Sequence, residues 1–197
     1  MKMFKKLMAV ALAGVMALTV LTGCAGTINK KEYVNVMNDM VKAVGKDLTV
    51  EQGSDKLAKE VLAKVEVYAE NHNRGEMRTK TAVAYDVLQT LTDRDGHDYA
   101  DIKAIVPDGA KDQYTLMWTQ LNDYESKAFK NNESAVNVMK MAIENRCKLN
   151  EVDEEKLGNT ATASIATQKI GDTTFLVIVL VRAAKQLTAP RKTGIKN

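Results

Sequence analysis

The side chains best suited to chemistry form two short groups in this sequence. His72 and Arg74 place an imidazole and a guanidinium two residues apart, a pairing that could line a polar cleft. Further on, carboxylates crowd around a second histidine and offer the oxygen ligands that Ca²⁺ prefers. The members of this second group are Asp93, Asp95, His97, Asp98 and, just beyond them, Asp101.

The sequence around both groups indicates a structural role rather than catalysis or metal binding. Gly96 occupies the fourth position of the acidic run, whereas an EF-hand loop requires its glycine at the sixth, so this motif is absent. A solvated loop is the expected state of the run, and an exposed polar helix end is the expected place of His72 and Arg74. The sequence also lacks a nucleophile elbow, a phosphate loop and a metalloprotease helix. We therefore expect no cofactor and no bound metal.

The first of two cysteines, Cys24, ends an N-terminal pattern typical of export. Lys2, Lys5 and Lys6 give a positive start, the apolar stretch 7–20 follows, and the segment Leu21-Thr22-Gly23-Cys24 closes it. That last segment resembles the lipobox of bacterial lipoproteins. The resemblance implies cleavage before Cys24, acylation of its thiol by fatty acids such as palmitate, and a lipid anchor on the extracytoplasmic face of the cell membrane. Two acyl chains suffice for stable anchoring, since each buried methylene contributes about 0.8 kcal/mol.

Processing at this site changes the charge and the cysteine chemistry of the mature chain. The full sequence has 28 basic and 25 acidic residues, and removal of three lysines with residues 1–23 leaves 25 of each. A formally neutral chain gives no indication of a nucleic-acid ligand, which requires a concentrated basic face, and we expect none. With Cys24 acylated, Cys147 has no disulfide partner, and we expect it to be a small packing residue.

Hydrophobic spacing predicts helices first and strands last. Helices are expected over 30–44, from the capping-box pattern of Thr49 and Gln52 to His72, over 79–91, around Tyr114 to Tyr124, and from Ser134 onward. Trp118 is then expected to be half-buried at a helix edge. A short strand is predicted over 102–106, and a C-terminal β-hairpin at 161–165 and 175–181 around Gly171-Asp172. The apolar run 175–181 is typical of a strand covered on both faces.

These elements indicate an α+β fold with helices packed on a small antiparallel sheet. The expected organisation is a signal peptide (1–23), a lipidated cysteine and tether (24–32), one domain (33–185) and a polar tail (186–197).

The order of these elements, with four short motifs, resembles the CAP superfamily (cysteine-rich secretory, antigen 5 and pathogenesis-related-1 proteins). The motifs are the helix start 33–38, the segment His72-Asn73-Arg74, the run 138–146 ending in Asn145-Arg146, and the hairpin after Gly158. The resemblance implies a CAP-like α-β-α sandwich in which His72, Arg74, Asn145 and Arg146 line a cleft. The chain departs from the family pattern because Asn145 stands where a second histidine would bind metal, and an Asn side chain does not replace that ligand.

The leading functional hypothesis is a membrane-tethered, non-enzymatic domain that binds an unidentified protein or small molecule at the cell envelope. One alternative is a metal-assisted enzyme with a CAP-type cleft around His72. Another is a structural envelope subunit, which an extended exposed apolar patch would favour.

Overall fold

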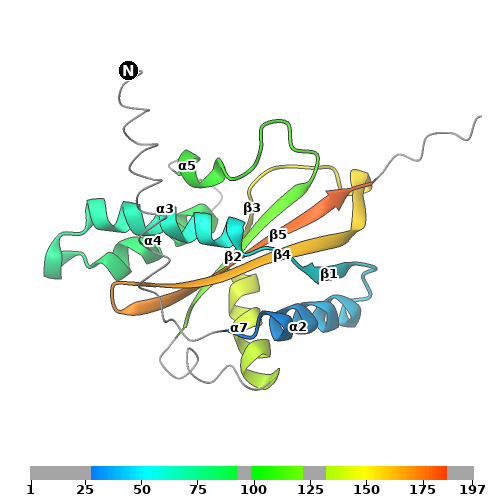
Figure 1. The fold of residues 1–197 in the computed structure, drawn as a ribbon, viewed down its shortest axis with the longest axis horizontal. Coiled ribbons are helices and arrows are strands. Elements are labelled where there is room, and N and C mark those ends of the chain that lie inside the picture. Colours follow the sequence, from blue (N-terminus) through cyan, green and yellow to red (C-terminus); the bar gives the residue numbers. More distant parts are fainter. Residues whose placement is uncertain (1–27, 93–98, 122–131, 186–197) are drawn as a thin grey trace, which may run out of the picture.

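In a computed structural model, residues 28–92, 99–121 and 132–185 form helices on both sides of an open five-stranded sheet (Figure 1). This is the α+β fold that the sequence predicts. The elements in chain order are α2 (Lys30–Ala43), β1 (Thr49–Gln52), α3 (Lys56–His72), η1 (Gly75–Met77), α4 (Lys80–Thr92), α5 (Ala100–Lys103), β2 (Gln113–Leu121), α7 (Asn132–Glu144), β3 (Arg146–Lys148), η2 (Glu154–Lys156), β4 (Leu157–Ile170) and β5 (Thr173–Ala184).

The sheet has the strand order β1-β4-β5-β2-β3 and is mixed, not purely antiparallel as predicted. Strand β1 runs parallel to β4, and every other neighbouring pair is antiparallel. The predicted C-terminal hairpin is confirmed as β4 and β5, whose pairing reaches Ile170 and Thr173 around the turn Gly171-Asp172. Gly171 has a φ of +67°, a conformation that favours glycine.

Two hydrophobic cores lie on the two faces of the sheet. One core joins α3, α4 and α5 to alternate residues of β5, including Phe175, Val177 and Val179. The other joins α2 and α7 to the intervening residues Leu176 and Ile178. Because both faces are covered, β5 contains consecutive apolar residues, which confirms the prediction made from the run 175–181.

The bounds of α2, α4 and α7 and the end of α3 at His72 agree with the apolar spacing. Asn29 caps α2, its side chain accepting from the backbone N–H of Glu32 at 3.4 Å. Gly45 follows the same helix with a φ of +68°, as expected of a residue that ends a helix.

Three predicted elements are wrong. The capping-box segment from Thr49 to Gln52 is strand β1, and the strand expected over 102–106 is a single helical turn, α5, followed by a turn. The helix expected from Tyr114 to Tyr124 is strand β2, which lies between β5 and the edge strand β3. Tyr124 lies outside the described residues. Trp118 is therefore not at a helix edge but is 1% exposed within the core beside α4.

The outer strand β1 is held to α2 by the side chain of Asn38. Its Oδ1 accepts from the backbone N–H of Val50 at 2.8 Å, and its Nδ2 donates to the carbonyl oxygens of Val50 (2.9 Å) and Val34 (3.1 Å). The amide thus takes the place of a neighbouring strand at Val50 and closes this part of the sheet edge.

We expect Asn38→Ala to lower the free energy of unfolding by about 1–3 kcal/mol, because it leaves partly buried backbone groups of β1 without partners. Asn35→Ala is the matched control, since Asn35 is exposed on the same helix and should change stability by less than about 0.5 kcal/mol. Urea unfolding of residues 25–197, followed by Trp118 fluorescence, would measure both. Equal effects of the two changes would contradict the role given to Asn38.

Candidate functional site

Several predicted site residues lie outside the described residues. They are Cys24 and the loop residues Asp93, Asp95, His97 and Asp98. Across the described ranges, no helix has both the length and the apolar character to cross a membrane.

His72 is the last residue of α3 and lies on an aromatic stack. Its ring is parallel to that of Tyr68, with centroids 3.9 Å apart, and Tyr68 in turn meets Tyr99 edge-on at 5.2 Å. The Nδ1 atom of His72 lies 2.9 Å from the carbonyl oxygen of Tyr68. A carbonyl only accepts, so this nitrogen carries the proton and Nε2 is the one left to face solvent. Two residues further on, the backbone N–H of Arg74 donates to the carbonyl oxygen of Arg78 at 2.9 Å.

Asn145 and Arg146 lie elsewhere, at the junction of α7 and β3. The Nδ2 atom of Asn145 donates to the backbone oxygen of Trp118 at 3.3 Å. Trp118 directly follows Met117, the last residue of β2 that pairs with β3. Arg146 donates to the carbonyl of Ile143 at 3.0 Å, near the end of α7.

The structure therefore does not bring the four cleft candidates together. Helix α3, which carries His72, packs in the core that includes α4, whereas α7 packs in the core on the other face of the sheet (Figure 1). Asn145 Nδ2 and Arg146 Nη1 each donate to a backbone carbonyl at the junction where α7 ends and β3 begins. Nowhere in residues 28–92, 99–121 and 132–185 is a group of three or more His, Cys, Asp or Glu side chains arranged to hold a metal ion.

Cys147 sits on the edge strand β3, opposite Leu116, and packs against the core of α3 and α4. It is half-buried, and this burial raises the pKa of its thiol to about 11, with Lys103 acting in the opposite direction. The thiol is thus protonated at neutral pH and is a poor nucleophile. A packing role, as predicted for this residue, fits its surroundings.

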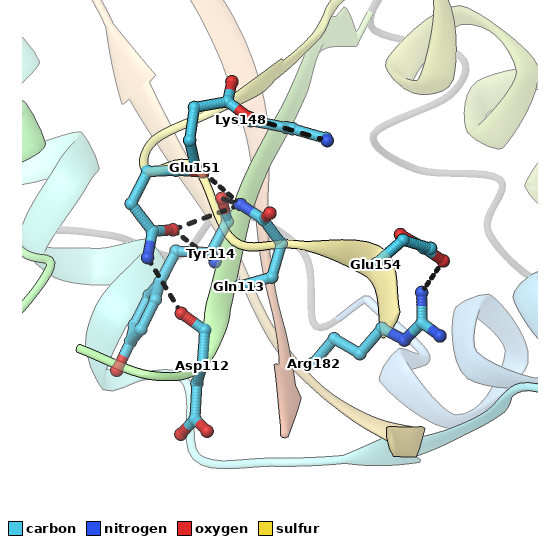
Figure 2. A network of polar contacts seen from close by, with 8 residues as sticks. Asp112, Gln113, Tyr114, Lys148, Glu151, Glu154 and Arg182 are labelled. Atoms are coloured by element: carbon cyan, nitrogen blue, oxygen red, sulfur yellow. Dashed lines mark hydrogen bonds and ion pairs between the residues drawn. The ribbon is translucent and has the colours of Figure 1, made fainter. Parts of the chain in front are cut away.

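A polar network that the sequence did not reveal joins the start of β2 to the segment after β3 (Figure 2). At its centre is Asn150, whose Oδ1 accepts from the backbone N–H of Tyr114 at 2.8 Å and whose Nδ2 donates to the carbonyl of Asp112 at 2.9 Å. The buried Gln113 donates to Asn150 as well, from Nε2 to Oδ1 at 3.1 Å. Asp112 extends the network to β5 by accepting from the N–H of Ala184 at 2.9 Å.

Nearby, Arg182 on β5 connects strand β4 to the short helix η2. Its Nε donates to the carbonyl of Gly158 at 2.7 Å, and its guanidinium forms an ion pair with Glu154 (Figure 2). This ion pair lowers the pKa of the Glu154 carboxyl. Most hydrogen bonds of Asn150, Asp112 and Arg182 satisfy backbone groups near strand ends. None of these hydrogen bonds joins a nucleophile to a base. We assign the network to the stability of the sheet.

No signal in the sequence would have found this network. Asn150 contacts residues 36 to 38 positions away, and an isolated Asn in a turn carries no information about such partners.

Large apolar side chains that are strongly exposed occur singly in the described part of the chain. Val44 follows α2, Met77 lies in η1 and Tyr85 lies on α4, with exposed fractions of 69%, 92% and 41%. Single exposed apolar residues are ordinary in soluble domains.

No family model, curated protein or solved structure matches this chain.

Proposed function

We propose that this chain is a bacterial lipoprotein: it is exported, cut before Cys24 and anchored to the cell membrane by lipid on that cysteine. The single observation that carries the proposal is Leu21-Thr22-Gly23-Cys24 placed directly after a lysine-rich start and an uncharged apolar stretch. Cys24 lies outside the described residues, so the support for the proposal is the order of residue types in the sequence. In this proposal residues 1–23 are removed and the α+β domain faces the extracytoplasmic side.

The domain itself is proposed to bind a protein or small molecule without catalysis. His72 and Asn145, the residues expected to share a cleft, belong to opposite layers, and the Cys147 thiol is held in its unreactive form. These placements do not support the CAP-type cleft in which His72 and Asn145 would act together.

Cys24→Ala is expected to abolish fatty-acid incorporation and to leave the chain at precursor size. The reason is that the acyl group requires the Cys24 thiol, and cleavage of lipoprotein precursors follows acylation. Metabolic labelling with a palmitate analogue in a bacterial host, followed by gel electrophoresis and membrane fractionation, measures both effects.

Cys147→Ala is the matched control because it removes the other thiol and should leave labelling, size and membrane location unchanged. Labelling that persists in the Cys24→Ala chain, together with a normally sized membrane-bound product, would refute the anchor.

A further inference from the structure

Four lysines lie in the first turns of α2 and α3, and ion pairs to one carboxylate connect the two helix starts. The Nζ atoms of Lys30 and Lys59 each lie 2.9 Å from Oδ2 of Asp55, which joins the two helix starts. Lys31 and Lys56 are exposed next to them in sequence. These residues, Lys30, Lys31, Lys56 and Lys59, are called the lysine cluster below.

The lysine cluster keeps a positive excess after its ion pairs are counted. A single carboxylate, that of Asp55, is shared by two ammonium groups. Glu32 is the other acid of these first turns, so four positive charges meet two negative ones. Glu60, one turn further along α3, is 3.8 Å from Lys64 and is thereby already paired.

The lysine cluster also lies close in sequence to Ile28, which precedes Lys30 by two positions. Ile28, the first described residue, is 8% exposed and belongs to the core formed by α2 and α7. Three residues separate it from Cys24, so the two Cα atoms can be at most about 14 Å apart. A lipid on Cys24 therefore keeps the start of α2 near the headgroups of the bilayer in which the lipid is embedded.

From this juxtaposition we propose that the lysine cluster is the membrane-facing surface of the domain and binds the phosphates of anionic phospholipids. The inference rests on the proposed lipid anchor and adds an orientation to it. At physiological ionic strength, charges on an exposed surface act over about 8 Å. The short connection to Cys24 allows the lysine cluster to come this close to the lipid headgroups. The opposite edge of the sheet is different, since Lys148 on the edge strand β3 lies 3.8 Å from Glu151.

Site-resolved labelling of lysines tests the orientation. The mature acylated protein, which begins at Cys24, is purified from bacterial membranes and added to vesicles of phosphatidylcholine alone or with phosphatidylglycerol. It is then labelled with an amine-reactive reagent and analysed by mass spectrometry. With phosphatidylglycerol present, labelling of Lys31 and Lys56 should fall roughly five-fold, the factor equivalent to about 1 kcal/mol of attraction per lysine. Lys148 is the internal control and should label equally in both vesicles. High salt should remove the protection.

A charge-reversed variant, Lys31→Glu with Lys56→Glu, should lose the protection of the remaining Lys30 and Lys59, whereas Lys148→Glu should retain it. Vesicle flotation separates the two proposals. Protein that floats with both vesicles but labels equally at Lys31 and Lys56, or is protected at Lys148 instead, overturns the orientation and leaves the anchor intact. Protein that floats with neither vesicle overturns the anchor and the orientation together.

Discussion

Replacing Trp118 by alanine is expected to lower the free energy of unfolding by about 3–5 kcal/mol, the range typical of removing a large aromatic side chain from a core. Trp118 is 1% exposed on β2, an inner strand of the sheet, and contacts two rings. Tyr85 meets it edge-on with centroids 5.4 Å apart, and Phe175 is 6.5 Å away on β5. Its loss would therefore leave a cavity between the sheet and α4.

Trp118→Phe is the matched control. It keeps an aromatic ring and removes an indole N–H that is buried without an acceptor in the described part of the chain, so its cost should be clearly smaller. Both variants can be compared by urea unfolding of residues 25–197, followed by far-ultraviolet circular dichroism because the fluorophore is absent. A loss below about 1.5 kcal/mol for Trp118→Ala would mean that the core collapses around the missing ring.

The helices and the C-terminal hairpin could be predicted from sequence because their signals are local. Apolar spacing defines one face of α2, α3, α4 and α7, and glycines with positive φ mark the end of α2 and the hairpin turn. Consecutive apolar residues in β5 can only be buried if helices cover both faces, and the two cores do so.

Strand β2 was missed because a strand buried on both faces carries no clear period of two. Tyr114, Met117 and Leu121 fit helical spacing, yet Met117 faces the core of α2 and α7 while its neighbours Leu116 and Trp118 face the other core. Strand β1 was missed for a different reason. Its four residues pair with β4 and with the side chain of Asn38, and both contacts join segments that are distant in sequence.

The candidate cleft shows the same limit of local information. The resemblance to the CAP superfamily implies a shared site for His72-Asn73-Arg74 and Asn145-Arg146, but whether the two segments meet depends on which face of the sheet each helix covers. Helix α3 packs across β4 and β5 in one layer, and α7 packs against β2 and α2 in the other. The sequence of each segment does not encode that choice, whereas the proposed signal for export and acylation lies entirely within the first 24 residues.

Replacing Gly171 by alanine is expected to lower the free energy of unfolding by about 2–4 kcal/mol, of which about 1–2 kcal/mol is the cost of a left-handed backbone at a residue with a Cβ. The remainder comes from Thr81 at the start of α4. An added Cβ would lie 2.4 Å from Thr81 Oγ1 and 3.0 Å from its backbone nitrogen. That hydroxyl donates to the carbonyl of Ile170 at 3.0 Å and accepts from the N–H of Asp172 at 3.1 Å, so α4 would lose its attachment to the hairpin turn.

Gly109→Ala isolates the two contributions, because Gly109 has a φ of +71° but nothing within 4 Å of an added Cβ. It should cost only the left-handed conformation, about 1–2 kcal/mol. Urea unfolding of both variants of residues 25–197 gives the difference, and the same Gly171→Ala change made in a Thr81→Ala background should show a smaller excess, since the contact is then already lost. If Gly171→Ala costs no more than Gly109→Ala, Thr81 does not constrain the turn, and the position of α4 is set by its apolar face alone.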